Sequence, residues 1–232
     1  APQVSYQLAP AQKEYFKDTK AVDKNGEPLR VYHGSSTKPF DSFAFGGWFT
    51  SDPSYASAYA QVIASGENVA YTGLTFPTHA RTIPSYINIK KPLELNFLES
   101  NEQLIDYSTY IDELGAIVNK QIPENIIDIF RDIAYEESIQ DGRVYAYEMT
   151  DILTRDEGKK WIESLGYDGI KVKEAYLSDP NIRDTELEYA DTYFAFKPEQ
   201  VKSVYNVNPK EDPKKSFQLA PKPKMFSTAE TV

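Results

Sequence analysis

The chain has 232 residues and a formal net charge of −10, and 41% of its residues are hydrophobic. This length allows one or two domains with a sizeable core. The acidic balance excludes the basic stripe that nucleic-acid binders present, so we expect no nucleic-acid partner. Cysteine is absent, which excludes disulfides, thiolate metal sites and cysteine nucleophiles.

Metal binding and membrane insertion are equally disfavoured. His33 and His79 are the two histidines of the chain, and their spacing does not suit a zinc site, so we expect no metal. No apolar run approaches the ~18 residues of a membrane span, and the N-terminus lacks a signal-peptide pattern. We therefore expect a cytoplasmic protein without a membrane partner.

Both ends of the chain are rich in proline and polar residues and lack an apolar period. We expect a tail with a short helix over residues 1–24 and a flexible tail over residues 206–232. The sequence YQLAP at 6–10 recurs as FQLAP at 217–221. A motif repeated at both edges of a domain suggests a part of a larger multi-domain chain, although coincidence would also produce it.

The first half of the chain predicts a strand over 29–33, a loop, and a short strand over 48–50. Asp52 then has the residue type of a helix N-cap, and Pro53 suits the first helical position. The resulting helix should run to about Ala64. Tyr55 and Tyr59 are four residues apart and share one face of it.

The second half continues with strands separated by helices. A helical period covers about 98–130 and is interrupted by Pro123, and a further helix over 156–165 ends at Gly166, which suits a C-cap. Strands are predicted over 86–89, 167–173, 192–196 and 201–205. Strands with inserted helices and no βαβ repeat indicate an α+β domain, which we place at 25–205 with a helical insertion at about 99–165.

Several short motifs follow one another in a specific order. They are GEPLRVYHGSS at 26–36, SYINIKKPLEL at 85–95, GYDGIKV at 166–172 and FKPEQVKSV at 196–204. In this order they resemble the diphtheria-toxin and poly(ADP-ribose)-polymerase branch of ADP-ribosyltransferases, and more narrowly the ADP-ribosyltransferase domains of polyvalent phage and mobile-element proteins. The resemblance covers about residues 25–205. It implies an ADP-ribosyltransferase fold, two small facing sheets with helical insertions, and NAD⁺ as the substrate.

The resemblance also assigns binding roles to individual residues. His33 matches the family histidine that holds the adenosine ribose, and Gly34 matches the glycine whose backbone binds the nicotinamide carboxamide. Tyr59 matches the tyrosine that stacks on the nicotinamide ring. Ser57 lies one position from the register of the carboxamide-binding serine. Ser35 completes the strand end that we expect to bind the cofactor.

Two positions depart from the family's histidine–tyrosine–glutamate triad. The tyrosine position falls on Trp48, next to Phe49, and we expect both aromatic residues in the cofactor site. An indole still stacks well on a cationic nicotinamide. The glutamate position falls on Thr192, with Asp191 and Glu188 as nearby acids. We expect one of these three to approach the ribose 2′-hydroxyl.

The missing glutamate matters because cleavage of the nicotinamide–ribose bond builds positive charge on the ribose. A carboxylate stabilises that charge as it grows. The resemblance implies mono-ADP-ribosylation of a protein acceptor with release of nicotinamide. Three alternatives stay open: a non-catalytic module that binds NAD⁺ or ADP-ribose, an NAD⁺ glycohydrolase, and a structural module delivered into a host cell with phage DNA.

Overall fold

The computed structural model describes residues 8–36, 40, 42–43, 46–65, 80–137, 143–177 and 187–217. His79 and most of the two QLAP repeats lie outside these residues. The helices are α1 (Pro10–Phe16), α2 (Pro53–Ser65), α3 (Tyr107–Val118), α4 (Glu124–Glu136), α5 (Ala146–Thr154), α6 (Asp156–Ser164) and the short η1 (Pro198–Gln200). The strands are β1 (Val31–Ser35), β2 (Gly47–Thr50), β3 (Arg81–Ile87), β4 (Pro92–Glu94), β5 (Leu104–Asp106), β6 (Arg143–Tyr145), β7 (Gly169–Leu177), β8 (Leu187–Ala195) and β9 (Val201–Ser203).

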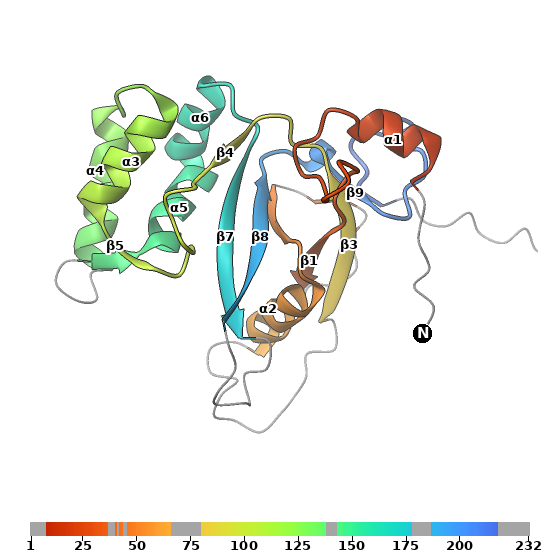
Figure 1. Cartoon of the computed structure of the whole chain (residues 1–232), viewed down its shortest axis with the longest axis horizontal. Helices are drawn as coiled ribbons and strands as arrows, with labels where there is room; N and C mark the ends of the chain where they lie inside the picture. Colours follow the sequence, from red (N-terminus) through yellow and green to blue (C-terminus); the bar gives the residue numbers. More distant parts are fainter. Residues whose placement is uncertain are drawn as a thin grey trace, which may run out of the picture.

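A seven-stranded mixed sheet forms the centre of the molecule (Figure 1). Its strand order is β4-β7-β8-β2-β1-β3-β9, and only β4 and β7 pair in parallel. A separate ribbon pairs β5 with β6. Helices α3 to α6 gather on one side of the sheet, beyond β7, and α1 lies at the opposite side near β3 and β9. The predicted α+β class is confirmed.

The sheet is split between β1 and β2. These strands pair only at Tyr32 and Thr50, whereas β2 pairs with β8 at four positions and β1 pairs with β3 at five. The two facing sheets that we expected therefore correspond to two halves, β4-β7-β8-β2 and β1-β3-β9, joined by one residue pair. Because the strands diverge beyond this pair, the sheet opens toward the end of β1 and the start of β2.

Helix α2 closes over the split from one face of the sheet. Its start follows the predicted cap, because the Asp52 carboxylate accepts the backbone N–H groups of Ser54 and Tyr55 at 2.7 and 2.9 Å. The helix then lies directly on β1 at Gly34. A Cβ atom at Gly34 would come within 2.1 Å of the carbonyl oxygen of Ala56. Glycine therefore sets how close α2 comes to the strand.

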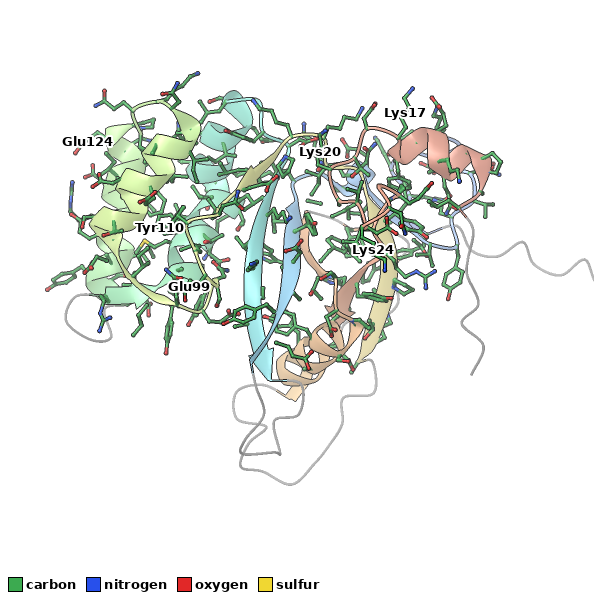
Figure 2. All side chains as sticks on the ribbon, in the orientation of Figure 1. Lys17, Lys20, Lys24, Glu99, Tyr110 and Glu124 are labelled. Atoms are coloured by element: carbon green, nitrogen blue, oxygen red, sulfur yellow. The ribbon has the colours of Figure 1, made fainter. Side chains whose placement is uncertain are left out.

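The helical part, α3 to α6 with the β5–β6 ribbon, shares its core with the sheet. Its buried side chains pack against Ile170, Val172 and Phe196, and Tyr110 lies fully buried at its centre (Figure 2). Pro123 separates α3 from α4 as predicted, while α5 was not predicted. None of the helices in the described ranges is long and apolar enough to cross a bilayer.

The segment that follows β9 packs against the domain instead of leaving it at residue 206. The side chain of Lys202 is fully buried, and its Nζ donates to the carbonyl groups of Pro213 and Lys215 at 2.6 and 2.8 Å. Phe217 then contacts Phe40 and Phe43 at ring distances of 5.5 and 5.8 Å. Residues 206–217, which we expected to belong to a flexible tail, are therefore packed on the domain, and residues 218–232 lie outside the described residues.

Replacing Lys202 by alanine should release this segment. Each hydrogen bond from a charged group contributes about 1.5–3 kcal/mol, so we expect the free energy of unfolding to fall by about 3 kcal/mol. Denaturant unfolding measures the loss. Lys210→Ala is the matched control, because Lys210 is exposed and forms a long 3.8 Å ion pair with Glu14. Equal effects of the two substitutions would contradict the role of the buried lysine.

Candidate functional site

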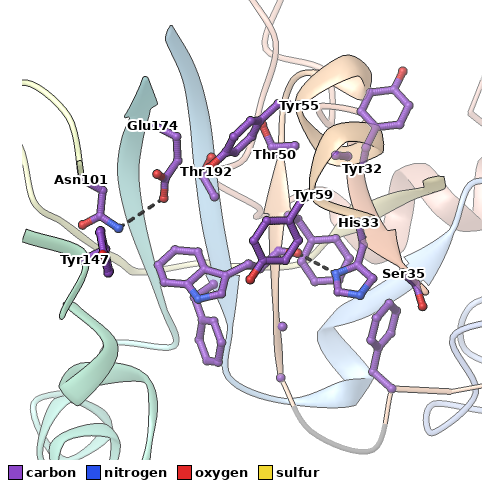
Figure 3. A pocket seen from close by; sticks show the side chains of 18 of the residues that line it. Tyr32, His33, Ser35, Thr50, Tyr55, Tyr59, Asn101, Tyr147, Glu174 and Thr192 are labelled. Carbon is purple, nitrogen blue, oxygen red and sulfur yellow. Dashed lines mark hydrogen bonds between the residues drawn. The ribbon is translucent and has the colours of Figure 1, made fainter. Parts of the chain in front are cut away.

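A cavity of about 1030 Å³ lies where β1 and β2 diverge. Its walls come from β1, β2, β7, β8 and α2 on the sheet side, and from α5 and residues 101–102 on the helical side (Figure 3). Small-molecule and cofactor sites occupy about 300–1,000 Å³. The cavity therefore has room for a dinucleotide. Its position follows from the fold. Between β1 and β2 the hydrogen-bond ladder stops after one residue pair, and α2 and the helical part enclose the space that this leaves.

His33 bridges the split at the end of β1. Its ring Nδ1 lies 2.9 Å from the carbonyl oxygen of Trp48, and because a carbonyl only accepts, Nδ1 carries the proton. Burial lowers the pKa of His33, with a further contribution from Arg81, so the ring is neutral at pH 7 and Nε2 is an acceptor. Gly34 and Ser35 continue the cavity wall.

Aromatic side chains form the middle of the cavity. Trp48 is half-buried and its indole packs edge-on against Phe194 at 5.1 Å. Tyr59 faces it from α2, with 48% of its surface exposed. Phe49 borders the cavity but belongs to the core, where it packs on Phe43. Two flat rings, Trp48 and Tyr59, are thus available to a planar ligand.

Of the three residues expected near the ribose 2′-hydroxyl, Thr192 lines the cavity and the two acids do not. Thr192 lines the cavity, and its buried Oγ1 has no hydrogen-bond partner among the described residues. Asp191 points to the opposite face of β8, where it forms a 3.0 Å ion pair with Lys171, because successive residues of a strand alternate between faces. Glu188 shares the face of Thr192 but lies four residues away, exposed and outside the cavity wall.

Ser57 also lies outside the cavity wall, although it was expected to bind the cofactor. It is two residues from both Tyr55 and Tyr59, and two residues correspond to roughly 200° around a helix. The two tyrosines face the cavity and Ser57 therefore points away from it.

A carboxylic acid that the sequence analysis missed lies in the cavity on β7. Glu174 is 8% exposed and accepts a 3.2 Å hydrogen bond from the side chain of Asn101. Burial, followed by hydrogen bonding and repulsion from Glu102, raises the pKa of Glu174 to about 9. The sequence held one signal: Glu174 continues the alternation of Ile170 and Val172, which places an acid at an inward-facing position.

Charge is distributed unevenly along the cavity. Glu174, Glu102 and Asp151 are together at the end formed by β7 and the helical part, and no lysine or arginine is among the described lining residues. Arg81 lies beside the opposite end, 5.2 Å from the ring of the lining residue Phe40, and its charge contributes to the lowered pKa of His33. The cavity therefore has an acidic end and an end next to a positive charge.

Comparison with known proteins gives one match. The family described as ADP-ribosyltransferase in polyvalent proteins matches residues 23–211, about four fifths of the chain. No curated protein and no solved structure matches the chain. The match covers the whole split sheet, the cavity and the helical part, and the predicted resemblance is confirmed. The chain belongs to the family of ADP-ribosyltransferase domains of polyvalent proteins.

Proposed function

We propose that the domain binds NAD⁺ in the cavity and transfers a single ADP-ribose to a protein acceptor, releasing nicotinamide. The polarity of the cavity is the observation that carries this proposal. NAD⁺ has an anionic pyrophosphate and a cationic nicotinamide. Arg81 lies beside the end that holds His33, and the carboxyl groups of Glu174, Glu102 and Asp151 lie at the other. Attraction between opposite charges orients the dinucleotide along this axis.

Each binding residue has a role in this orientation. The neutral Nε2 of His33 accepts a hydroxyl of the adenosine ribose beside Arg81. The carboxamide meets the backbone at Gly34 and Ser35, and the charged ring points from there toward the acidic end. Trp48 and Tyr59 hold the nicotinamide ring between them, with cation–π attraction to the charged ring. Nicotinamide loses its charge as the bond to ribose breaks, so stacking contributes affinity and orientation more than rate.

The protein acceptor reaches the cavity from the helical part in this proposal. Tyr147 and Asp151 of α5 line the cavity and are partly exposed. The ring of Tyr147 stacks on that of Tyr145 at 5.3 Å, which extends an aromatic surface outward from the cavity. We also propose that the domain acts within a longer polyvalent chain, delivered into a host cell, without binding nucleic acid itself.

A non-catalytic NAD⁺-binding module is the second candidate, because Thr192 stands where the family places its glutamate. Incubating the purified domain with adenine-labelled NAD⁺ and a cell lysate discriminates between the candidates. Nicotinamide release with labelled protein supports the transferase. Release with free ADP-ribose and no labelled protein identifies a glycohydrolase. Binding without release supports the module, and a melting temperature that millimolar NAD⁺ leaves unchanged contradicts both candidates.

His33→Ala should weaken NAD⁺ binding about tenfold, because one hydrogen bond to a ribose hydroxyl is lost. The affinity of the parent should fall as the pH drops below 6.5, since the lowered pKa of His33 places protonation of Nε2 in that range. The affinity of the variant should show no such fall at low pH. Thermal shifts with NAD⁺ at several pH values measure both effects. Tyr135→Ala on α4, an exposed residue far from the cavity, is the control.

A further inference from the structure

Two carboxyl groups from different segments meet in the cavity. Glu174 comes from β7, and Glu102 comes from the loop that leads into the helical part. Glu102 is fixed by the backbone N–H of Ala175, at 2.7 Å, and by the hydroxyl of Ser100. Both carboxyl groups line the cavity, and interaction with Glu102 is one of the causes, after burial, that raise the pKa of Glu174 to about 9. Glu174 therefore holds a proton at pH 7.

The helical part holds this pair in position. Asn101 is buried, and its side-chain oxygen accepts the hydroxyl proton of Thr150 at 2.8 Å. Its amide nitrogen must therefore face Glu174. The hydroxyl of Tyr110, at the centre of the helical core, lies 3.1 Å from that of Thr150. A chain of hydrogen bonds thus connects Glu174 to the core of the helical part. Figure 3 shows its first member, the bond from Asn101 to Glu174.

The remaining titratable groups that face the pair are acids and phenols. Tyr55 hydrogen-bonds to Glu174 from α2, and burial raises its pKa, so it is neutral and donates. Tyr59 stands next to it on the same helix face, and Asp151 faces the cavity from α5. Since no lysine or arginine lines the described cavity, a ligand must supply the positive charge that the pair lacks.

We infer that Glu174 and Glu102 form a carboxyl pair that supplies, from β7 and the helical part, the negative charge that the register of β8 does not provide. This inference rests on the proposed function and names its catalytic residues. The position of the pair beside Thr192 puts its charge next to the ribose of a dinucleotide oriented as described above.

The transfer needs no reactant besides NAD⁺ and the acceptor. The bond between the ribose C1′ and the nicotinamide nitrogen breaks, and both electrons leave with nicotinamide, which becomes neutral. The positive charge passes to the ribose, where the pair stabilises it more strongly than in the ground state. A lone pair of the acceptor then forms the bond to C1′. The proton that the acceptor loses passes to the carboxylate of the pair and then to water.

Two isosteric variants test the pair, with turnover and binding measured separately. Glu174→Gln and Glu102→Gln should each lower the rate of nicotinamide release about 100-fold or more, as the removal of a transition-state contact does. Their NAD⁺ affinity should stay within about threefold of the parent. Glu99→Gln is the matched control, because Glu99 is exposed and lies three residues before Glu102. Turnover by either cavity variant above about one fifth of the parent rate overturns the inference.

Proton release on binding separates this inference from the proposed function. The cationic nicotinamide should lower the pKa of Glu174, so NAD⁺ binding near pH 8 should release part of a proton in the parent. Glu174→Gln should release none. Calorimetry in two buffers of different ionisation enthalpy measures the difference. If the parent releases this proton on binding but releases no nicotinamide, the proposed transferase activity is contradicted, while the coupling of the carboxyl pair to the ligand stands. A parent that turns over, with equal proton release by the variant, overturns the pair alone.

Discussion

Replacing Glu174 by glutamine should make the folded domain more stable, and the gain should increase with pH. The folded pKa of about 9 lies above the value of 4.5 for a free glutamate. A group with a raised folded pKa contributes its full stability below pH 4.5 and loses it as the pH rises toward 9. Glutamine does not titrate, and its amide can donate to Glu102 as the protonated acid does.

The gain in the free energy of unfolding should be on the order of 3 kcal/mol at pH 7, relative to its value at pH 4.5. Denaturant unfolding of parent and variant at four pH values between 4.5 and 9 measures it. Glu99→Gln should show no such trend. A variant that is less stable than the parent at every pH would mean that the pair stabilises the fold, and a catalytic reason for its burial would no longer be needed.

Replacing Gly34 by alanine should cost both stability and NAD⁺ binding. The added Cβ would meet the carbonyl oxygen of Ala56 at 2.1 Å and the backbone nitrogen of Ala60 at 2.9 Å. Backbone atoms cannot rotate away, so α2 must move off β1. Overpacking of this kind costs about 3 kcal/mol. Since Tyr55 and Tyr59 move with α2, the wall of the cavity moves as well.

Ile126→Ala separates the two effects. Ile126 is buried in α4, which supplies no residue to the described cavity wall, and removal of its side chain should cost about 3 kcal/mol. We expect a similar loss of stability, while the rise in melting temperature with NAD⁺ should persist. The same rise in the Gly34 variant would show that the spacing between α2 and β1 is irrelevant to the cavity.

Much of the fold could be predicted from local sequence signals. Asp52 and Pro53 predicted the start of α2, Pro123 predicted the break between α3 and α4, and Gly166 lies at the end of α6 with a positive φ of 85°. Each signal depends on backbone chemistry within a few residues. The short strands β4, β5 and β6 were missed, because three-residue strands contain too little sequence to show an alternation.

The acidic end of the cavity could not be predicted in the same way. Asp191 and Glu188 were chosen because they are close to Thr192 in sequence. Asp191 points to the opposite face of β8, and Glu188 is too far along the strand to reach the cavity. Glu174 reaches the cavity from the neighbouring strand, and Glu102 from a loop 72 residues earlier in the chain. Glu174 is brought to the cavity by the pairing of β7 with β8, and Glu102 by its hydrogen bond from the backbone of Ala175. Local periodicity does not encode either of these tertiary contacts.

The single residue pair that joins β1 to β2 has a consequence for how the domain responds to a ligand. Amide groups on a strand edge that faces no hydrogen-bonded partner exchange their hydrogens readily, because few bonds must break for water to reach them. A dinucleotide that fills the split would take the place of the missing ladder. Deuterium uptake at β1 and β2 should then slow on NAD⁺ addition, while uptake in β3, which pairs with β1 at five positions, should change little. The ligand would therefore protect the backbone amides on the two strand edges that the sheet itself leaves unpaired.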